Sequence, residues 1–128
     1  MNLLLDTSAL LWWFADDAML PDAIAGAIDD PGNDILVSSA SAWEICTKVR
    51  NGRLPSAYEL SERFGSFLAD WHFQPLAITI EHARLAGRLP GSHKDPFDRM
   101  LAAQALIEDV PLVTNDPAFA IFGVNVSW

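Results

Sequence analysis

Four separate segments of this sequence carry carboxylates next to a short apolar run or a predicted helix start: Asp6, Glu44, Asp95 with Asp98, and Asp116. Asp6 directly follows residues 3–5, and Asp116 comes shortly after residues 111–113. In an open parallel sheet, ligands bind outside the carboxyl ends of the strands. We therefore expect these segments to bring their carboxylates to one rim of the fold.

Carboxylates gathered at one rim would need a compensating cation, since each one raises the pKa of its neighbours. Mg²⁺ prefers hard oxygen ligands and is commonly held by one or two carboxylates, with water and substrate phosphate oxygens completing its coordination. Held in this way, it can lower the pKa of a water molecule and neutralise charge on a phosphoryl group. Phosphodiester hydrolysis is the reaction that such a site suits best.

Each acid also has a purely structural interpretation when it is taken alone. Such an acid can cap a helix or complement the dipole of its first turn. This interpretation applies to Asp6, to Glu44 in the capping-box pattern Ser41 to Glu44, to Asp95, to Asp98 and to Asp116. For Asp95, which precedes Pro96, the capping role is favoured. The case for a site therefore depends on the convergence of the segments and not on any single residue.

The elements that must position these acids alternate along the chain. Short apolar runs predict strands at 3–5, 35–37, 75–80, 111–113 and 124–126, and helical patterns cover 9–15, 42–49, 56–71 and a segment beginning at Pro96. In segment 56–71 the apolar side chains form one stripe, with Ser56 and Glu59 as a capping-box pattern. Fully apolar strands between helices indicate a parallel sheet covered on both faces. We predict an α/β fold, a three-layer α/β/α sandwich with a central, mainly parallel sheet.

Composition narrows the class of protein further. A chain of 128 residues suits one domain, residues 1–128, and no apolar run approaches the ~20 residues that cross a bilayer, so we expect a soluble cytoplasmic protein. The lone Cys46 excludes an internal disulfide, and its apolar helical surroundings predict that it is buried. The net charge of −9 argues against wrapping of nucleic acid by bulk charge. All eight basic residues nevertheless lie between Lys48 and Arg99, which leaves room for a local phosphate-binding face.

The adjacent residues Trp12 and Trp13 raise a separate question. Neighbouring side chains on a helix point about 100° apart, so two different surfaces must cover these two indoles. A contact with a partner protein would cover one of them, and a wide stripe facing the core would cover both. The sequence leaves these alternatives open.

Taken together, four motifs resemble the PIN domain family and, more narrowly, the VapC toxins of bacterial type II toxin-antitoxin pairs. They are Leu-Leu-Leu-Asp-Thr-Ser at 3–8, Ser-Ala-Trp-Glu-Ile at 41–45, His-Lys-Asp-Pro-Phe-Asp-Arg-Met-Leu-Ala-Ala-Gln-Ala at 93–105, and Leu-Val-Thr-Asn-Asp at 112–116. The match covers nearly the whole chain in the right order, and the third motif is highly specific. The resemblance implies a Mg²⁺- or Mn²⁺-dependent endoribonuclease that is often a homodimer and is neutralised by a cognate antitoxin.

The resemblance also implies roles for particular residues. Asp6, Glu44, Asp98 and Asp116 match the family's acids, and we expect Asp6 and Asp98 to be the direct metal ligands. Side chains expected to support these acids are Ser8, Asp95, Thr114 and Asn115. Candidates for contacts with RNA phosphates are Lys48, Arg50, Arg53, Lys94 and Arg99. His93 is a candidate for a phosphate contact only, since a metal-activated water needs no histidine base.

Two other functions remain to be weighed against a ribonuclease. An aspartyl phosphatase or phosphotransferase would use Asp6 as its nucleophile, but such enzymes typically have a second acid two residues later, where this chain has Ser8. A non-catalytic acidic module that binds a protein partner would explain the eight acids of residues 1–47, which no Lys or Arg accompanies. Metal binding distinguishes the second alternative from the nuclease.

Overall fold

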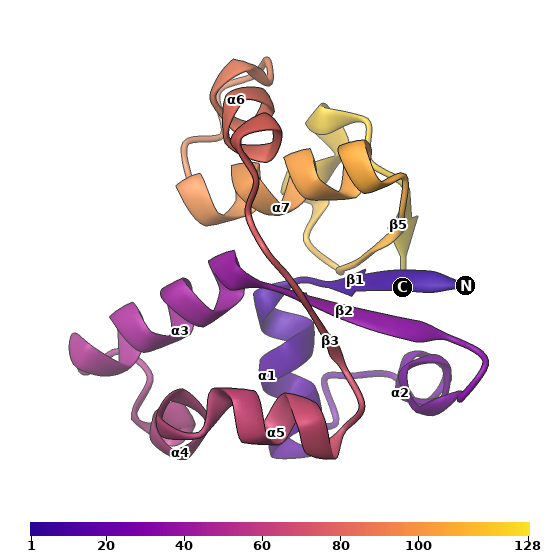
Figure 1. Ribbon diagram of the computed structural model, residues 1–128, viewed down its shortest axis with the longest axis vertical. Helices are drawn as coiled ribbons and strands as arrows, with labels where there is room; N and C mark the ends of the chain where they lie inside the picture. Colours follow the sequence, from indigo (N-terminus) through magenta and orange to yellow (C-terminus); the bar gives the residue numbers. More distant parts are fainter.

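Five parallel strands form the single sheet of the computed structural model, which describes residues 1–128 (Figure 1). The strand order is β3-β2-β1-β4-β5. In chain order the strands are β1 (Asn2–Leu5), β2 (Asp34–Ser38), β3 (Gln74–Leu76), β4 (Leu112–Val113) and β5 (Val126–Ser127). Because β1 lies in the middle, the residue that follows it stands at the centre of the sheet's carboxyl edge.

Strand β1 lies in the centre of the sheet because its side chains are apolar on both faces. Leu3, Leu4 and Leu5 are all buried, so neither face of β1 can point to water. In register, Leu5 stands beside Val37 of β2 on one side and Val113 of β4 on the other. The segments that follow these three strands therefore emerge next to one another.

Helices cover both faces of the sheet and complete three layers, as predicted (Figure 1). Leu3 and Leu5 belong to a core with side chains from one set of helices, and Leu4 belongs to a second core on the opposite face. The first set is α1 (Thr7–Ala15), α2 (Asp22–Asp29), α3 (Ser39–Arg50), α4 (Tyr58–Glu62) and α5 (Phe64–Asp70). The second is α6 (Ile80–Arg88), α7 (Pro96–Glu108) and the 3₁₀ helix η2 (Pro117–Phe122).

The helix predicted over 56–71 is interrupted in the structure. A 3₁₀ turn, η1 (Pro55–Ala57), precedes α4, and the helix is interrupted again at Arg63, before α5. Ser56 caps nothing, because it lies inside η1, and the exposed carboxylate of Glu59 pairs with Arg63 instead. The apolar stripe was read correctly, since Leu60 and Leu68 are buried, but the stripe does not require one continuous helix.

Both tryptophans of α1 are partly buried by aromatic side chains of the same chain. Trp12 lies edge-on to Trp128 with ring centroids 5.7 Å apart, and Trp13 lies 5.8 Å from the ring of Phe73. Intramolecular packing thus accounts for much of the surface of both indoles. No helix combines the length and the apolar composition that crossing a membrane would need.

Candidate active site

Asp6 stands at the carboxyl end of β1 and is the N-cap of α1. Its Oδ1 accepts a hydrogen bond from the backbone N–H of Ala9 at 2.7 Å, and the Thr114 hydroxyl also bonds to the carboxyl. The residue is only 5% exposed. Burial, together with the neighbouring charges of Asp98 and Asp116, raises the pKa of Asp6 from 3.8 to about 6 despite these two bonds. The cap role and a place in an acidic cluster therefore coexist.

Asp98 lies in the first turn of α7, the helix that Asp95 caps. Oδ1 of Asp95 accepts bonds from the N–H groups of Phe97 and Asp98 at 2.9 and 3.1 Å. Burial raises the pKa of Asp98, and the charges of Asp95 and Glu44 act in the same direction, while a hydrogen bond from His93 opposes them. The cap assignment for Asp95 is confirmed.

The carboxylate of Glu44 is not used to cap its helix, because α3 starts earlier than the sequence pattern predicts. Ser38 caps α3 through a 2.9 Å bond from Ala40 N–H, so the predicted capping box of Ser41 and Glu44 does not form. Ser41 bonds instead to the Thr7 hydroxyl at 3.0 Å, which joins the starts of α1 and α3. Glu44 Oε2 pairs with Lys48 at 2.5 Å, and Oε1 is buried with no hydrogen-bond partner.

Asp116 reaches the same rim from beyond β4, where it is exposed to solvent. Its Oδ1 caps η2 by accepting from Ala118 N–H at 2.9 Å, and its own N–H donates to the Thr114 hydroxyl at 3.0 Å. Thr114 is fully buried and bonds to Asp6 as well. The Thr114 hydroxyl thus bonds to the backbone of Asp116 and to the carboxyl of Asp6.

The other candidate residues from the sequence differ in their exposure and in their contacts. Ser8 and Asn115 are exposed, and their side chains make no hydrogen bond with the protein. Arg50, Arg53 and Lys94 are exposed as a phosphate contact requires. Lys48 is held by Glu44, next to the acids themselves.

Arg99 corrects the list of candidate RNA contacts. Its Nε donates to the carbonyl of Ala86 at 2.9 Å and its Nη1 to the carbonyl of His93 at 3.0 Å, while Nη2 donates to the carbonyl of Leu89. A guanidinium whose nitrogens bind three backbone carbonyls is committed to the fold. Arg99 therefore has a structural role in this chain in place of the expected RNA contact.

His93 is the residue that sequence reasoning undervalued. Its Nε2 lies 2.9 Å from Oδ2 of Asp98, and the side chain is 25% exposed. A spacing of five residues across a loop and a helix start gives no periodic signal, so only the folded loop shows that the two side chains meet.

The four acids fit the ligand chemistry of a hard divalent cation. Each is held by at least one protein donor, and the second oxygens of Glu44, Asp98 and Asp116 accept no hydrogen bond from the protein. A buried carboxylate oxygen without a partner is costly, and a cation would satisfy it. No three His, Cys, Asp or Glu side chains are arranged closely enough to hold an ion by themselves. Mg²⁺, which takes one or two carboxylates and keeps water, needs no such closed set.

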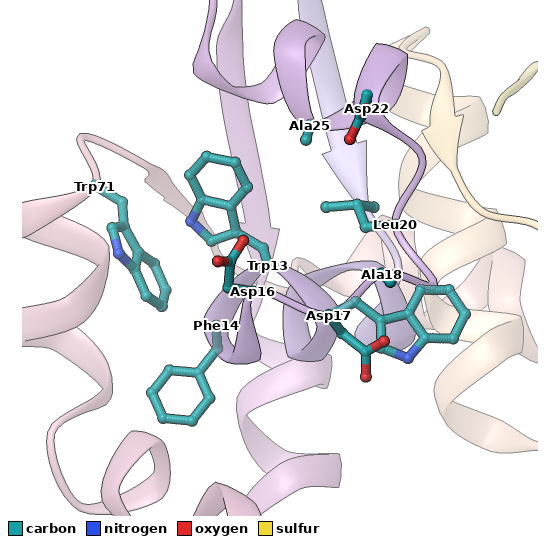
Figure 2. A pocket seen from close by; sticks show the side chains of 10 residues that line it. Trp13, Phe14, Asp16, Asp17, Ala18, Leu20, Asp22, Ala25 and Trp71 are labelled. Carbon is teal, nitrogen blue, oxygen red and sulfur yellow. The ribbon is translucent and has the colours of Figure 1, made fainter.

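The largest cavity of the protein lies elsewhere, at the end of α1 farthest from Asp6 (Figure 2). It measures about 450 Å³ and contains none of the four acids. Figure 2 shows Trp13, Trp71 and Asp16 among the side chains that line it. None of the four acids lines a cavity of the kind that encloses a small molecule.

Comparison with known proteins identifies the family to which this chain is similar. The family model described as PIN domain matches residues 3–124. Ribonuclease VapC22 of Mycobacterium tuberculosis is 30% identical over 116 residues, which cover 90% of this chain and 87% of that protein.

Solved structures share the fold at lower identity. VapBC2 from Rickettsia felis, crystallised with a DNA fragment from its promoter, superposes with a TM-score of 0.74 at 18% identity, over 100% of this chain and 99% of the other. VapBC-1 from nontypeable Haemophilus influenzae gives 0.70 at 16% identity, over 99% and 97%. FitAcB from Neisseria gonorrhoeae gives 0.67 at 18% identity, over 97% and 95%.

Proposed function

Because the chain belongs to the PIN domain family, we propose that it is a Mg²⁺- or Mn²⁺-dependent endoribonuclease, built as one domain over residues 1–128. The observation that supports this proposal is that Asp6, Glu44, Asp98 and Asp116 come from four segments and are coupled by charge: Asp98 and Asp116 act on Asp6, and Glu44 acts on Asp98. The charge of Asp98 raises the pKa of Asp6, and burial raises the pKa of both carboxyls. A divalent cation beside the two carboxyls would favour the ionised form of both.

In the proposed reaction the more buried acids bind the metal, and the exposed acid faces the substrate. A divalent cation at this site supplies an acidified water and neutralises charge on the scissile phosphate. Asp6 and Asp98 are its direct ligands, and Thr114 and Ala9 hold the Asp6 carboxyl in place. Glu44 presents its unpartnered Oε1 from the opposite helix.

The exposed acid and the nearby bases would face the substrate. Asp116 lies at the solvent side of the rim, where a carboxylate can accept a proton or orient a water molecule. Arg50, Arg53 and Lys94 are exposed and unpaired in the structure, so they remain the candidates for RNA phosphate contacts. Such contacts position a nucleic acid without reading its sequence.

A protein partner forms part of the same proposal. The structures that share this fold include toxin-antitoxin complexes, VapBC and FitAB, and the relative with 30% identity is a VapC protein. We propose that this chain is the toxin of such a pair, neutralised by a cognate antitoxin, and that it forms a homodimer in the cytoplasm. Co-purification with the product of an adjacent small gene, and loss of nuclease activity in that complex, would support this assignment.

The activity itself is tested with purified protein on structured RNA, in EDTA and then with added Mg²⁺ or Mn²⁺. We expect cleavage only with metal, and a loss of at least about a hundredfold in Asp98→Asn, since that change removes a direct ligand. Asp70→Asn, an exposed acid at the end of α5, is the matched control and should cut normally. A wild type that cuts no RNA with either metal would refute the proposal, and so would an Asp98→Asn variant as active as the control.

A further inference from the structure

His93 meets the candidate metal site from the loop between α6 and α7. Its Nε2 is 2.9 Å from Oδ2 of Asp98, and because an ionised carboxylate can only accept, the ionised form of Asp98 requires the imidazole to carry a proton on Nε2. No other protein group donates to the Asp98 carboxylate, so its second oxygen, Oδ1, is free. The donor is present whether the imidazole is neutral or charged.

The imidazole is itself held in place by the chain around it. Nη1 of Arg99 donates to the backbone carbonyl of His93 at 3.0 Å, and the Phe122 ring lies 5.9 Å from the imidazole. The guanidinium of Arg99 stands over the same Phe122 ring at 5.6 Å. Because Arg99 is the residue after Asp98, the histidine and the carboxylate that it contacts are tied to the same turn of α7.

The path of the loop also leaves little freedom. Gly91 has a φ of +103°, and a Cβ at this position would stand 1.9 Å from Cδ1 of Ile121 in η2. Only glycine permits both this backbone conformation and this close approach. The loop therefore packs directly on η2, and this packing holds His93 next to Asp98.

We propose that His93 is a positioning residue of this site: its Nε2–H holds Oδ2 of Asp98, so that Oδ1 is presented to the cation in one orientation. The inference rests on the proposed metal-dependent function. Hydrogen bonds to ligand side chains set their direction, and removing such a partner typically lowers metal affinity by about 10- to 100-fold. Asp6 receives comparable help from Ala9 and Thr114, and His93 is the only group that gives it to Asp98.

Two substitutions separate hydrogen bonding from packing. His93→Phe keeps a ring against Phe122 and removes the donor, whereas His93→Gln keeps a donor and removes the ring. We expect His93→Phe to weaken Mn²⁺ binding, measured by calorimetry on the metal-free protein, by about tenfold or more, and His93→Gln to stay within about threefold of the wild type. His72→Asn, at an exposed histidine with a φ of +61° that Asn tolerates, is the control and should not change the affinity.

The outcomes distinguish this inference from the proposed function. A wild type that binds Mn²⁺, with a His93→Phe variant that binds it equally well, would overturn the positioning role and leave the nuclease proposal intact. A wild type without saturable Mn²⁺ binding would overturn both. Thermal unfolding without metal is the accompanying readout, because a packing role alone would lower the melting temperature of His93→Gln, which loses the ring, and would leave the Mn²⁺ affinity of His93→Phe unchanged.

Discussion

Replacing Asp6 by Asn should stabilise the metal-free protein while it destroys the site. At neutral pH the folded state must keep a carboxylate that is 5% exposed and close to two other acids. The pKa of about 6 in place of 3.8 measures how much the fold disfavours the charged form. One unit of pKa is worth ~1.4 kcal/mol, so the charge costs the folded state up to roughly 3 kcal/mol at pH 7.5.

Asparagine imitates the protonated carboxyl, since its Oδ1 can still accept from Ala9 N–H and asparagine is as good an N-cap as aspartate. We expect Asp6→Asn to gain about 1 to 3 kcal/mol at pH 7.5. For a chain of this size that is a rise in melting temperature of roughly 4 to 12 °C. Thermal unfolding in EDTA measures it, with the exposed Asp17→Asn as a control that should change little.

The pH dependence of this difference supplies the sharper test. Because the folded state binds the Asp6 proton more tightly than the unfolded state, this group's contribution to stability is full below pH 3.8 and is lost as the pH rises through about 6. The wild type should therefore recover about half of the difference at pH 5. Adding Mn²⁺ at pH 7.5 should stabilise the wild type and not Asp6→Asn. The reasoning is wrong if Asp6→Asn melts below the wild type in EDTA at pH 7.5, or if their difference is the same at pH 5.

Three further changes test the structure around the site. Arg99→Lys replaces a fork that binds three carbonyls by a single ammonium, and should lower the free energy of unfolding in urea by about 2 to 4 kcal/mol. Asp95→Ala should cost about 1 kcal/mol as a lost cap, yet leave Mn²⁺ affinity within a few-fold, because Asp95 is tied to backbone N–H groups and Asp98 is the ligand. Gly91→Ala should destabilise by at least about 1 kcal/mol, since its Cβ would overlap Ile121; an equally stable variant would mean that the loop does not pack there.

The layers of the fold follow from local patterns and were predictable. The apolar triplet at Leu3, Leu4 and Leu5 can only be a strand buried on both faces, and the acid after it must stand at the sheet's carboxyl edge. Asp95 before Pro96 gave the start of α7 correctly. These inferences needed no knowledge of which elements touch.

Helix boundaries and long-range contacts were less accessible. The predictions did not include α2 or α6, because α2 is short and α6 is capped by Thr79 with His82, a box whose second member is a histidine and not the usual acid or amide. Cys46, predicted to be buried, is exposed on α3. The Ser41 and Glu44 pattern was misread, because Ser38 caps α3 and the Ser41 hydroxyl is bound by Thr7 from another helix.

The candidate site was predictable in its acids but not in what orients them. Asp6 and Asp116 follow strands, Asp98 lies in the first turn of α7 and Glu44 in the second turn of α3, so the topology of the sheet places all four near its carboxyl edge. The partner of Asp98 depends on how the loop before α7 folds back to bring in His93, whereas the pair of Glu44 with Lys48 follows from their i,i+4 spacing within α3. Arg99 was likewise not predictable: its charge predicts a contact at the surface, but its guanidinium binds backbone carbonyls of the fold.

The strand order has a consequence for how the protein folds. β1 is the first strand in the chain, yet its neighbour β4 comes from residues 112–113, so the pair closes a loop that includes nearly the whole sequence. Loops of that length are slow to close, and their contacts form late. Asp6 can meet Asp116 only after this last pairing, whereas β1 and β2 can associate earlier. Partly folded chains would thus have much of the sheet and no assembled carboxylate cluster, and a stopped-flow experiment would see Mn²⁺ binding develop with the slowest folding phase.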